Sequence, residues 1–201
     1  MGALAANVPR PRRGLWLVRH GALAADGERR LVGARDLPMS DEGRAQIRAL
    51  ARDFMPRIGS ALSALVCSDL SRCRETAALL LEACADTPPL VVEPGFREIG
   101  LGLWEGLNRE AIRRRWPGAF EARGRDMANF IPPAGESFRM VERRALEALF
   151  RLRTRHPQGL VLVVTHAGVM RALLSRYWGL PLERVWHIPQ DYACRRFLPG
   201  W

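Results

Sequence analysis

The chain has 201 residues, 31 basic and 21 acidic side chains and a formal net charge of +10, and every one of the 31 basic side chains is an arginine. The absence of lysine excludes Schiff-base and pyridoxal chemistry, and it excludes the lysine-containing P-loop that binds nucleotide phosphates. Arginine is a planar, bidentate donor for phosphate and carboxylate, so the composition favours an anionic ligand. The hydrophobic content of 48% is typical of a globular protein, and the length predicts one domain or at most two small ones.

The positive charge has two explanations. Clustered arginines can neutralise the phosphate backbone of a nucleic acid. The basic clusters at 10–13, 113–115 and 151–155 are not interleaved with aromatic residues at any regular spacing for base stacking. We therefore favour an arginine-rich composition without nucleic-acid binding, and we keep an Arg-rich nucleic-acid or anion-binding module as the alternative.

The cysteines and the hydropathy predict a cytoplasmic protein. The four cysteines form no C-x-x-C pair and have no partner histidine at zinc spacing, so we expect reduced, mostly buried thiols. The apolar run Leu15–Val18 is too short for a signal peptide. No stretch approaches the roughly 18 uncharged apolar residues of a membrane span, so we expect no membrane partner.

Residues 1–13 are expected to form a mobile tail, and residues 14–201 a single domain. In that domain short apolar runs alternate with longer amphipathic segments, which is typical of an α/β fold with a parallel sheet. The predicted strands are Leu15–Val18, Ala64–Cys67, Leu90–Glu93 and Leu160–Thr165. The predicted helices begin at Ser40 and Ser71, and two more run over Ser137–Arg155 and Ala167–Trp178. We expect a three-layer αβα sandwich with a mostly parallel central sheet of about six strands.

The segment 94–136 is rich in glycine and proline, which interrupt any long element. We expect it to form loops and a small helical cap over the carboxyl ends of the strands. Open α/β sheets bind their ligands at that edge.

Two histidines directly follow predicted strands. His20 lies in an Arg-His-Gly triplet after the first strand, and His166 follows the last. Either histidine alone would more often have a structural role, but two at equivalent strand ends favour a shared site. Arg19 and Arg72 occupy similar positions, so three strand ends together predict an anion hole suited to a phosphoryl group.

A phosphoryl-transfer site also needs a proton source, because the oxygen that leaves a phosphate monoester must be protonated. Glu98, in the irregular segment, is the carboxylate that we select. An ion pair between Glu98 and Arg97, or another arginine, is the structural alternative.

With these residues in order, the sequence resembles the histidine phosphatase superfamily, in its phosphoglycerate-mutase-like branch. The resemblance runs from about Leu15 to at least Leu174. It rests on five ordered motifs, which lie at Leu17–Gly21, between Gly33 and Gln46, between Cys67 and Ala77, at Arg97–Gly106, and at Gly135–Ser137 with Val164–Val169.

The resemblance implies a role for each candidate residue. His20 would attack phosphorus and carry a phosphohistidine, Arg19, Arg72 and His166 would bind the phosphoryl oxygens, and Glu98 would act first as acid and then as base on water. The resemblance implies no metal ion and no other cofactor, because cationic side chains stabilise the charge. One departure is Asp26, which stands where the family usually has an asparagine that touches phosphate, and this leaves the phosphate contact from that loop open.

About 38 positions separate Glu98 from Glu136, and this short cap resembles the family's phosphatases rather than its longer mutases. We therefore expect a phosphatase for a small-molecule phosphate monoester. The resemblance extends to α-ribazole phosphatases of cobalamin biosynthesis, so α-ribazole 5′-phosphate is one candidate substrate. Phosphoryl transfer of the phosphoglycerate mutase type is the enzymatic alternative. The oligomeric state stays open, with a homodimer as one alternative.

Overall fold

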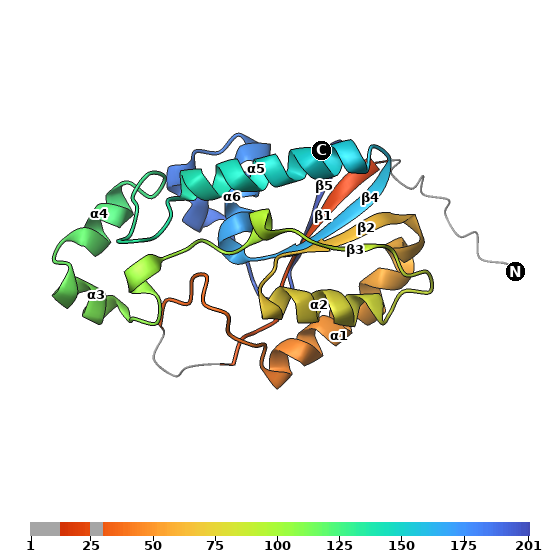
Figure 1. Cartoon of the computed structure of the whole chain (residues 1–201), viewed down its shortest axis with the longest axis horizontal. Coiled ribbons are helices and arrows are strands. Elements are labelled where there is room, and N and C mark those ends of the chain that lie inside the picture. The colour runs from red at the N-terminus through yellow and green to blue at the C-terminus, as the bar shows by residue number, and fades with distance from the viewer. Residues whose placement is uncertain (1–12, 25–29) are drawn as a thin grey trace, which may run out of the picture.

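The computed structural model describes residues 13–24 and 30–201, which form an α/β fold around one sheet (Figure 1). The strands are β1 (Arg13–Arg19), β2 (Leu62–Cys67), β3 (Leu90–Val92), β4 (Gly159–Thr165) and β5 (Arg195–Pro199). Their order is β3-β2-β4-β1-β5, and only β5 runs antiparallel to its neighbour among the described strands. The predicted mostly parallel α/β sheet is confirmed, with five strands in the described residues rather than about six.

Helices cover both faces of the sheet. The long helices are α1 (Asp41–Ile58), α2 (Ser71–Leu81), α5 (Phe138–Arg155) and α6 (Ala167–Trp178). In Figure 1, α1 and α2 lie below the sheet, while α5 and α6 lie above it. Successive residues of the central strands alternate between the two sides, so Val163 packs with the α5 and α6 core and Val164 with the α1 and α2 core. The three layers are therefore held by two hydrophobic cores, one on each face.

Local capping explains where three of the long helices begin or end. The Ser40 hydroxyl accepts a hydrogen bond from the Gly43 amide at 3.0 Å at the start of α1, and Ser137 accepts from Met140 at 3.2 Å at the start of α5. Gly179 ends α6 in the left-handed conformation, at φ 66°. These are the residues at which the sequence predicted the boundaries.

Two details of the sheet differ from the sequence prediction. Strand β1 begins at Arg13, which we had assigned to the tail; the rest of that tail, 1–12, lies outside the described residues, as does Asp26. Strand β5 was not predicted, because it contains two arginines and a proline, and only Leu198 in it is buried. An edge strand of this kind has no apolar run that marks it in the sequence.

The segment 94–136 forms short elements beyond the carboxyl ends of the strands, at the left in Figure 1. These elements are the 3₁₀ helices η2 (Pro94–Phe96) and η3 (Gly102–Trp104), then α3 (Arg109–Arg115) and α4 (Ala119–Arg125). The fully buried Trp104 packs against Phe130 and Phe120, with ring centroids 5.5 and 6.1 Å away, and so anchors the cap. Two more 3₁₀ helices, η1 (Gly59–Ala61) and η4 (Leu182–His187), lie outside this segment. None of the helices in the described ranges has the length and apolar content needed to cross a membrane.

Candidate active site

Neighbouring strands bring the two histidines together. Strands β1 and β4 pair in parallel with Arg19 opposite Thr165, so His20 and His166, the next residue on each chain segment, leave the sheet side by side. Their ring centroids lie 5.1 Å apart. The placement of both at adjacent strand ends agrees with the expectation from the sequence.

His20 is held as a neutral imidazole with one ring nitrogen free. Its Nδ1 donates to the Gly21 carbonyl oxygen at 2.7 Å, which leaves the lone pair on Nε2 available. Burial, followed by the charges of Arg72 and Arg19, lowers the pKa of His20 to about 3. The ring therefore stays unprotonated at neutral pH, which is the state that a nucleophilic histidine requires.

His166 is fully buried and fixed through both ring nitrogens. Its Nδ1 accepts from Arg72 Nε at 3.2 Å, and its Nε2 donates to the Ser68 hydroxyl at 2.8 Å. The Cys73 sulfur packs 3.3 Å from the same Nε2. Burial, with the nearby His20 and Arg72, lowers the pKa of His166 well below its usual value. Ser68 and Cys73 were not predicted to contact the site, although Ser68 lies in one of the motifs.

Arg72, at the start of α2, is 1% exposed and oriented by main-chain carbonyls. Its guanidinium donates to the carbonyls of Arg35 at 2.6 Å and Gly33 at 3.0 Å, besides the bond to His166. These three bonds use three of the five guanidinium hydrogens, so two remain for an anion. The loop that supplies the carbonyls is fixed by Asp36, whose carboxylate accepts from the amide and the hydroxyl of Ser71 at 2.8 and 2.7 Å and caps α2.

Arg19 is positioned by the loop before β5, which the sequence did not assign to the site. The guanidinium donates to the Gln190 carbonyl and lies over the Tyr192 ring, 3.8 Å from its centroid. The main chain of the same loop bonds to β1 and His20, through Cys194 to Arg19 at 3.0 Å and through Ala193 to His20 at 3.2 Å. Among the described residues, the buried Nε of Arg19 has no hydrogen-bond partner, so it is a free donor at the site.

Glu98 approaches the site from the cap side of the sheet. Its carboxylate accepts from the Gly168 amide at the start of α6, at 3.1 and 3.2 Å, and from the Ile99 amide at 2.9 Å. A side chain at position 168 would overlap with the Glu98 carboxylate, so this approach needs glycine. The alternative of an ion pair with Arg97 is wrong, since Arg97 pairs with Asp69 at 2.8 Å.

Two further motif residues, Glu136 and Glu105, fix the segment Arg97–Gly106, which carries Glu98 and is called the acid loop below. Arg144 forms a two-pronged ion pair with Glu136, at 2.9 Å for each bond, and donates to the carbonyl of Glu98 at 3.2 Å. Glu105 accepts from the amides of Ala34 and Leu101 at 2.8 and 2.9 Å, and so joins the acid loop to the loop that orients Arg72. These carboxylates are therefore structural, whereas the Glu98 carboxylate is bonded at Gly168, two residues after His166.

A cavity of about 170 Å³ lies beside Glu98, between the cap, α6 and η4. Its lining includes Glu98 and Gly168 from the site, together with Arg123, Phe138, Arg171 and Trp186. The cavity therefore lies beside the candidate acid Glu98 and the start of α6, directly after His166.

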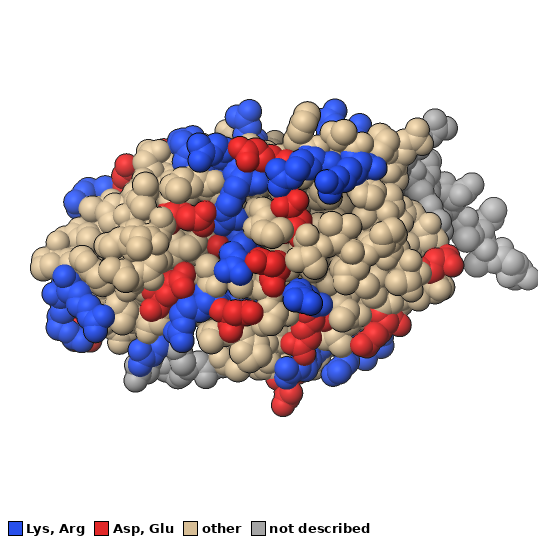
Figure 2. All heavy atoms as spheres, viewed as in Figure 1, with Lys and Arg blue, Asp and Glu red and all other residues tan. Residues whose placement is uncertain are grey.

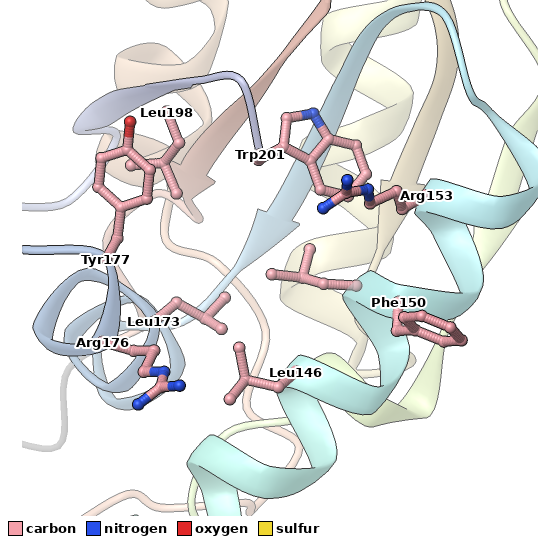
Figure 3. A pocket seen from close by; sticks show the side chains of 9 residues that line it. Leu146, Phe150, Arg153, Leu173, Arg176, Tyr177, Leu198 and Trp201 are labelled. Atoms are coloured by element: carbon pink, nitrogen blue, oxygen red, sulfur yellow. The ribbon is translucent and has the colours of Figure 1, made fainter.

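A second hollow, of about 250 Å³, lies between α5, α6 and the C-terminal residues (Figure 3). Figure 3 shows Leu146 from α5 pointing toward Leu173 from α6, with Arg176 and Tyr177 on the α6 side and Arg153 and Trp201 on the other side. No histidine, cysteine or carboxylate side chain is among the described residues that line it. This hollow therefore lacks the groups that phosphoryl transfer requires.

The arginines outside the site are mostly mixed with acidic side chains. On the face shown in Figure 2, blue and red atoms alternate, with the densest blue along α5 at the top. Many of these arginines form ion pairs, such as Arg44 with Glu75 at 2.6 Å and Arg113 with Glu121 at 2.6 Å. This distribution favours the explanation that arginine replaces lysine throughout the chain, and it argues against a nucleic-acid-binding surface.

The comparisons with known proteins agree with the geometry. The sequence profile of the Histidine phosphatase superfamily (branch 1) matches residues 15–198. The chain is 29% identical over 181 residues to the Adenosylcobalamin/alpha-ribazole phosphatase of Escherichia coli (strain K12), which covers 90% of this chain and 86% of the relative. It is 31% identical over 163 residues to the Metal-independent phosphoserine phosphatase of Arabidopsis thaliana, covering 80% and 66%. The crystal structure of the alpha-ribazole phosphatase from Shigella flexneri has a TM-score of 0.78 at 27% identity, covering 92% of this chain and 89% of that one.

Proposed function

Because the chain belongs to the histidine phosphatase superfamily, we propose that it hydrolyses a small-molecule phosphate monoester through a phosphohistidine at His20. The chain is a phosphoric monoester hydrolase, as its family and its phosphatase relatives show. The observation that carries the mechanism is the state of His20, a neutral imidazole with Nδ1 bonded to a carbonyl and Nε2 free.

The first step transfers the phosphoryl group to the enzyme. The Nε2 lone pair of His20 attacks phosphorus as the bond to the ester oxygen breaks. Arg19 Nε and the two unused hydrogens of Arg72 are donors for the other phosphoryl oxygens, and His166 joins them once its Nε2–H turns from the Ser68 hydroxyl to a phosphoryl oxygen. Fixed donors of this kind stabilise the charge of the transition state without reorganising, which is the main source of catalysis in phosphoryl transfer.

Glu98 moves the protons of both steps. In its protonated form it gives the proton to the leaving oxygen, so that a neutral alcohol departs. The resulting carboxylate then takes a proton from a water molecule that attacks the phosphohistidine. The second step releases inorganic phosphate and restores neutral His20 and protonated Glu98, so atoms and charge balance over the cycle.

The proposed mechanism uses no metal ion, since the guanidinium groups of Arg19 and Arg72 would stabilise the phosphoryl charge, with His166 as a further donor. Among the described residues, no three His, Cys, Asp or Glu side chains form a group that could hold a metal. One relative carries metal independence in its name. We expect full activity in the presence of a chelator.

The proposed mechanism applies to any phosphate monoester and does not by itself identify the substrate of this chain. The names of the relatives point to esters as different as α-ribazole phosphate and phosphoserine. We propose α-ribazole 5′-phosphate as one candidate among several. Phosphoryl transfer to a second phosphoglycerate, as in a mutase, is the enzymatic alternative. The cap of this chain is short, and no described segment extends it toward the longer cap of the mutases.

The test is a panel of phosphate monoesters assayed with the native chain and with His20→Ala. We expect the native protein to release inorganic phosphate and the variant to lose at least about 10³-fold in kcat, since the covalent step has no other nucleophile. Quenching with a denaturant at alkaline pH after reaction with a ³²P-labelled ester should trap a phosphoenzyme that is stable in base and loses its label in acid. An equally active variant would overturn the mechanism, and phosphate retained on an organic product would favour the mutase. Salt-sensitive nucleic-acid binding without phosphatase activity would favour the binding module.

A further inference from the structure

Arg123 is a buried cation without an ionic partner. It lies on α4 in the cap, it is 7% exposed, and no hydrogen bond or ion pair joins it to any described residue. Burial lowers its pKa to about 10, so the guanidinium is still charged at neutral pH. Its nearest companions are aromatic, with the ring centroids of Trp186 and Phe138 at 5.8 and 5.9 Å from the guanidinium carbon.

A buried charge of this kind is unfavourable unless something pairs with it. Cation–π contacts offset only part of the lost hydration, and they satisfy none of the five N–H groups. Arg144, an arginine that is more exposed, shows the usual solution, since it bonds to both oxygens of Glu136 and to two carbonyls. Arg123 therefore has hydrogen-bonding capacity that no described residue uses, and its nitrogens are not among the fully enclosed polar atoms, so a group bound in the cavity can reach them.

The cavity beside Glu98 is where such a partner can bind. Arg123 lines it, opposite the site formed by Glu98 and Gly168. Arg171 lines the same cavity, with its Nε bonded to the Ile188 carbonyl at 3.1 Å and its guanidinium 4.8 Å from the centroid of the Trp186 ring that also faces Arg123. Among the described lining residues, Glu98, the proposed acid, is the one carboxylate that faces Arg123 and Arg171.

We infer that the substrate carries a second anionic group, a carboxylate or a phosphate, on the part of the molecule that leaves, and that Arg123 binds it in this cavity. The inference rests on the proposed function, because Glu98 lies between the phosphoryl site and the cavity. Pairing with Arg123 would hold the ester oxygen next to Glu98. α-Ribazole carries no such group and would leave Arg123 unpaired, so efficient hydrolysis of α-ribazole 5′-phosphate, the candidate substrate named above, would count against this role of Arg123.

A matched pair of substrates tests this directly. Glycerol 3-phosphate and 3-phosphoglycerate have the same carbon skeleton and differ in a hydroxymethyl group against a carboxylate. Glycerol 1,3-bisphosphate keeps the same carbon skeleton and 2-hydroxyl and carries a second phosphate ester in place of the carboxylate, and α-ribazole 5′-phosphate supplies the neutral nucleoside. We expect the native chain to favour at least one of the two anionic esters over glycerol 3-phosphate by about 10- to 100-fold in kcat/KM, as for a charge-assisted hydrogen bond. Whichever anionic ester is favoured identifies the group that the cavity accepts.

The variant is Arg123→Met, which keeps the length of the side chain and removes the charge, and its control is Arg125→Met, which removes an exposed arginine from the same helix. Arg123→Met should abolish the preference, mainly by raising KM for the anionic ester, and it should leave glycerol 3-phosphate within about threefold. Arg125→Met should preserve the preference. Since Arg123→Met removes an unpaired buried charge, its Tm should equal or exceed that of the native chain.

Three results would overturn the inference: no preference for either anionic ester, an equal loss on all substrates in Arg123→Met, or a Tm that falls by several degrees, which would make Arg123 structural. Hydrolysis of p-nitrophenyl phosphate that depends on His20 separates these failures from failure of the proposed function. If no ester is hydrolysed, the proposed function fails, and the rise in Tm on adding 3-phosphoglycerate or the bisphosphate decides the question. A rise equal in the native chain and in Arg123→Met, or absent from both, would exclude binding at Arg123.

Discussion

The phosphoryl site and the cavity beside it are built in opposite ways. In the phosphoryl site His20, His166 and Arg72 are buried and each is bonded to a carbonyl or to a neighbouring side chain of that site. In the cavity, Arg123 is equally buried and bonded to nothing in the described chain. The first arrangement suits a group that every substrate shares, and the second suits a group that only the right substrate supplies. Under the proposed mechanism, the residues at the strand ends would carry out the chemistry and those lining the cavity would select the substrate.

The largest effect should follow from a change in the phosphoryl site that leaves the cavity intact. Arg72→Met removes donors to the phosphoryl oxygens, so we expect a loss of about 10²–10³-fold in kcat, by analogy with the removal of one oxyanion donor. Because all esters share this group, the loss should be similar for p-nitrophenyl phosphate and for alkyl esters. Steady-state assays on both classes measure it, with Arg74→Met, an exposed arginine of the same helix, as the control. A loss confined to one class would contradict the assignment.

A change at the border of the two regions should discriminate between leaving groups. Glu98→Gln keeps the shape of the side chain but removes the proton that it supplies. We expect kcat for alkyl esters to fall by about 10²-fold or more, and kcat for p-nitrophenyl phosphate to fall much less, since nitrophenolate leaves without protonation. The ratio of the two rate constants is the measurement. Equal losses on both esters would show that Glu98 is not the acid.

Gly168→Ala should also slow alkyl esters more than p-nitrophenyl phosphate, but by less than Glu98→Gln does. The added methyl group would overlap with the Glu98 carboxylate, which must then leave its bonds to the Gly168 amide. We expect a loss of about 10-fold on alkyl esters with little change on p-nitrophenyl phosphate, because misplacement of a catalytic group by about 1 Å is costly. The matched control is Gly124→Ala, where a methyl group would meet no atom within 4 Å. If both variants behave alike, the close approach of Gly168 has no role.

The sequence predicted the central sheet and the residues of the phosphoryl site far better than it predicted the cavity beside them, and the reasons are physical. Apolar runs and local caps such as Ser40, Ser137 and Gly179 act over a few residues, so the central strands and long helices were placed correctly. Parallel pairing then brings residues at strand ends together, which is why His20 and His166 could be placed side by side. Their catalytic roles, and those of Arg19, Arg72 and Glu98, remain predictions.

The parts that the sequence did not predict depend on contacts between distant segments. Strand β5 has no apolar run, and the loop before it reaches Arg19 through Gln190 and Tyr192, which lie about 170 residues away along the chain. Arg123 is one of 31 arginines, and nothing in its sequence neighbours shows that its side chain is buried without a hydrogen-bond partner. Such properties arise from tertiary packing, and only the three-dimensional structure reveals them.

The smallest effect concerns stability rather than activity, and it tests how firmly the phosphoryl site is fixed. The pKa of His20 is about 3 in the folded chain and 6.5 in an unfolded one, so the unfolded state takes up a proton that the folded state refuses between these values. The stabilisation is complete above pH 6.5 and is lost as the pH falls toward 3. In His20→Gln, the decrease in unfolding free energy from pH 7.5 to pH 5.5 should be about 1.4 kcal/mol smaller than in the native chain. Urea unfolding at the two pH values measures it. An identical decrease in both proteins would show that His20 protonates freely in the folded state, and the phosphoryl site would then be as open to solvent as a surface cleft.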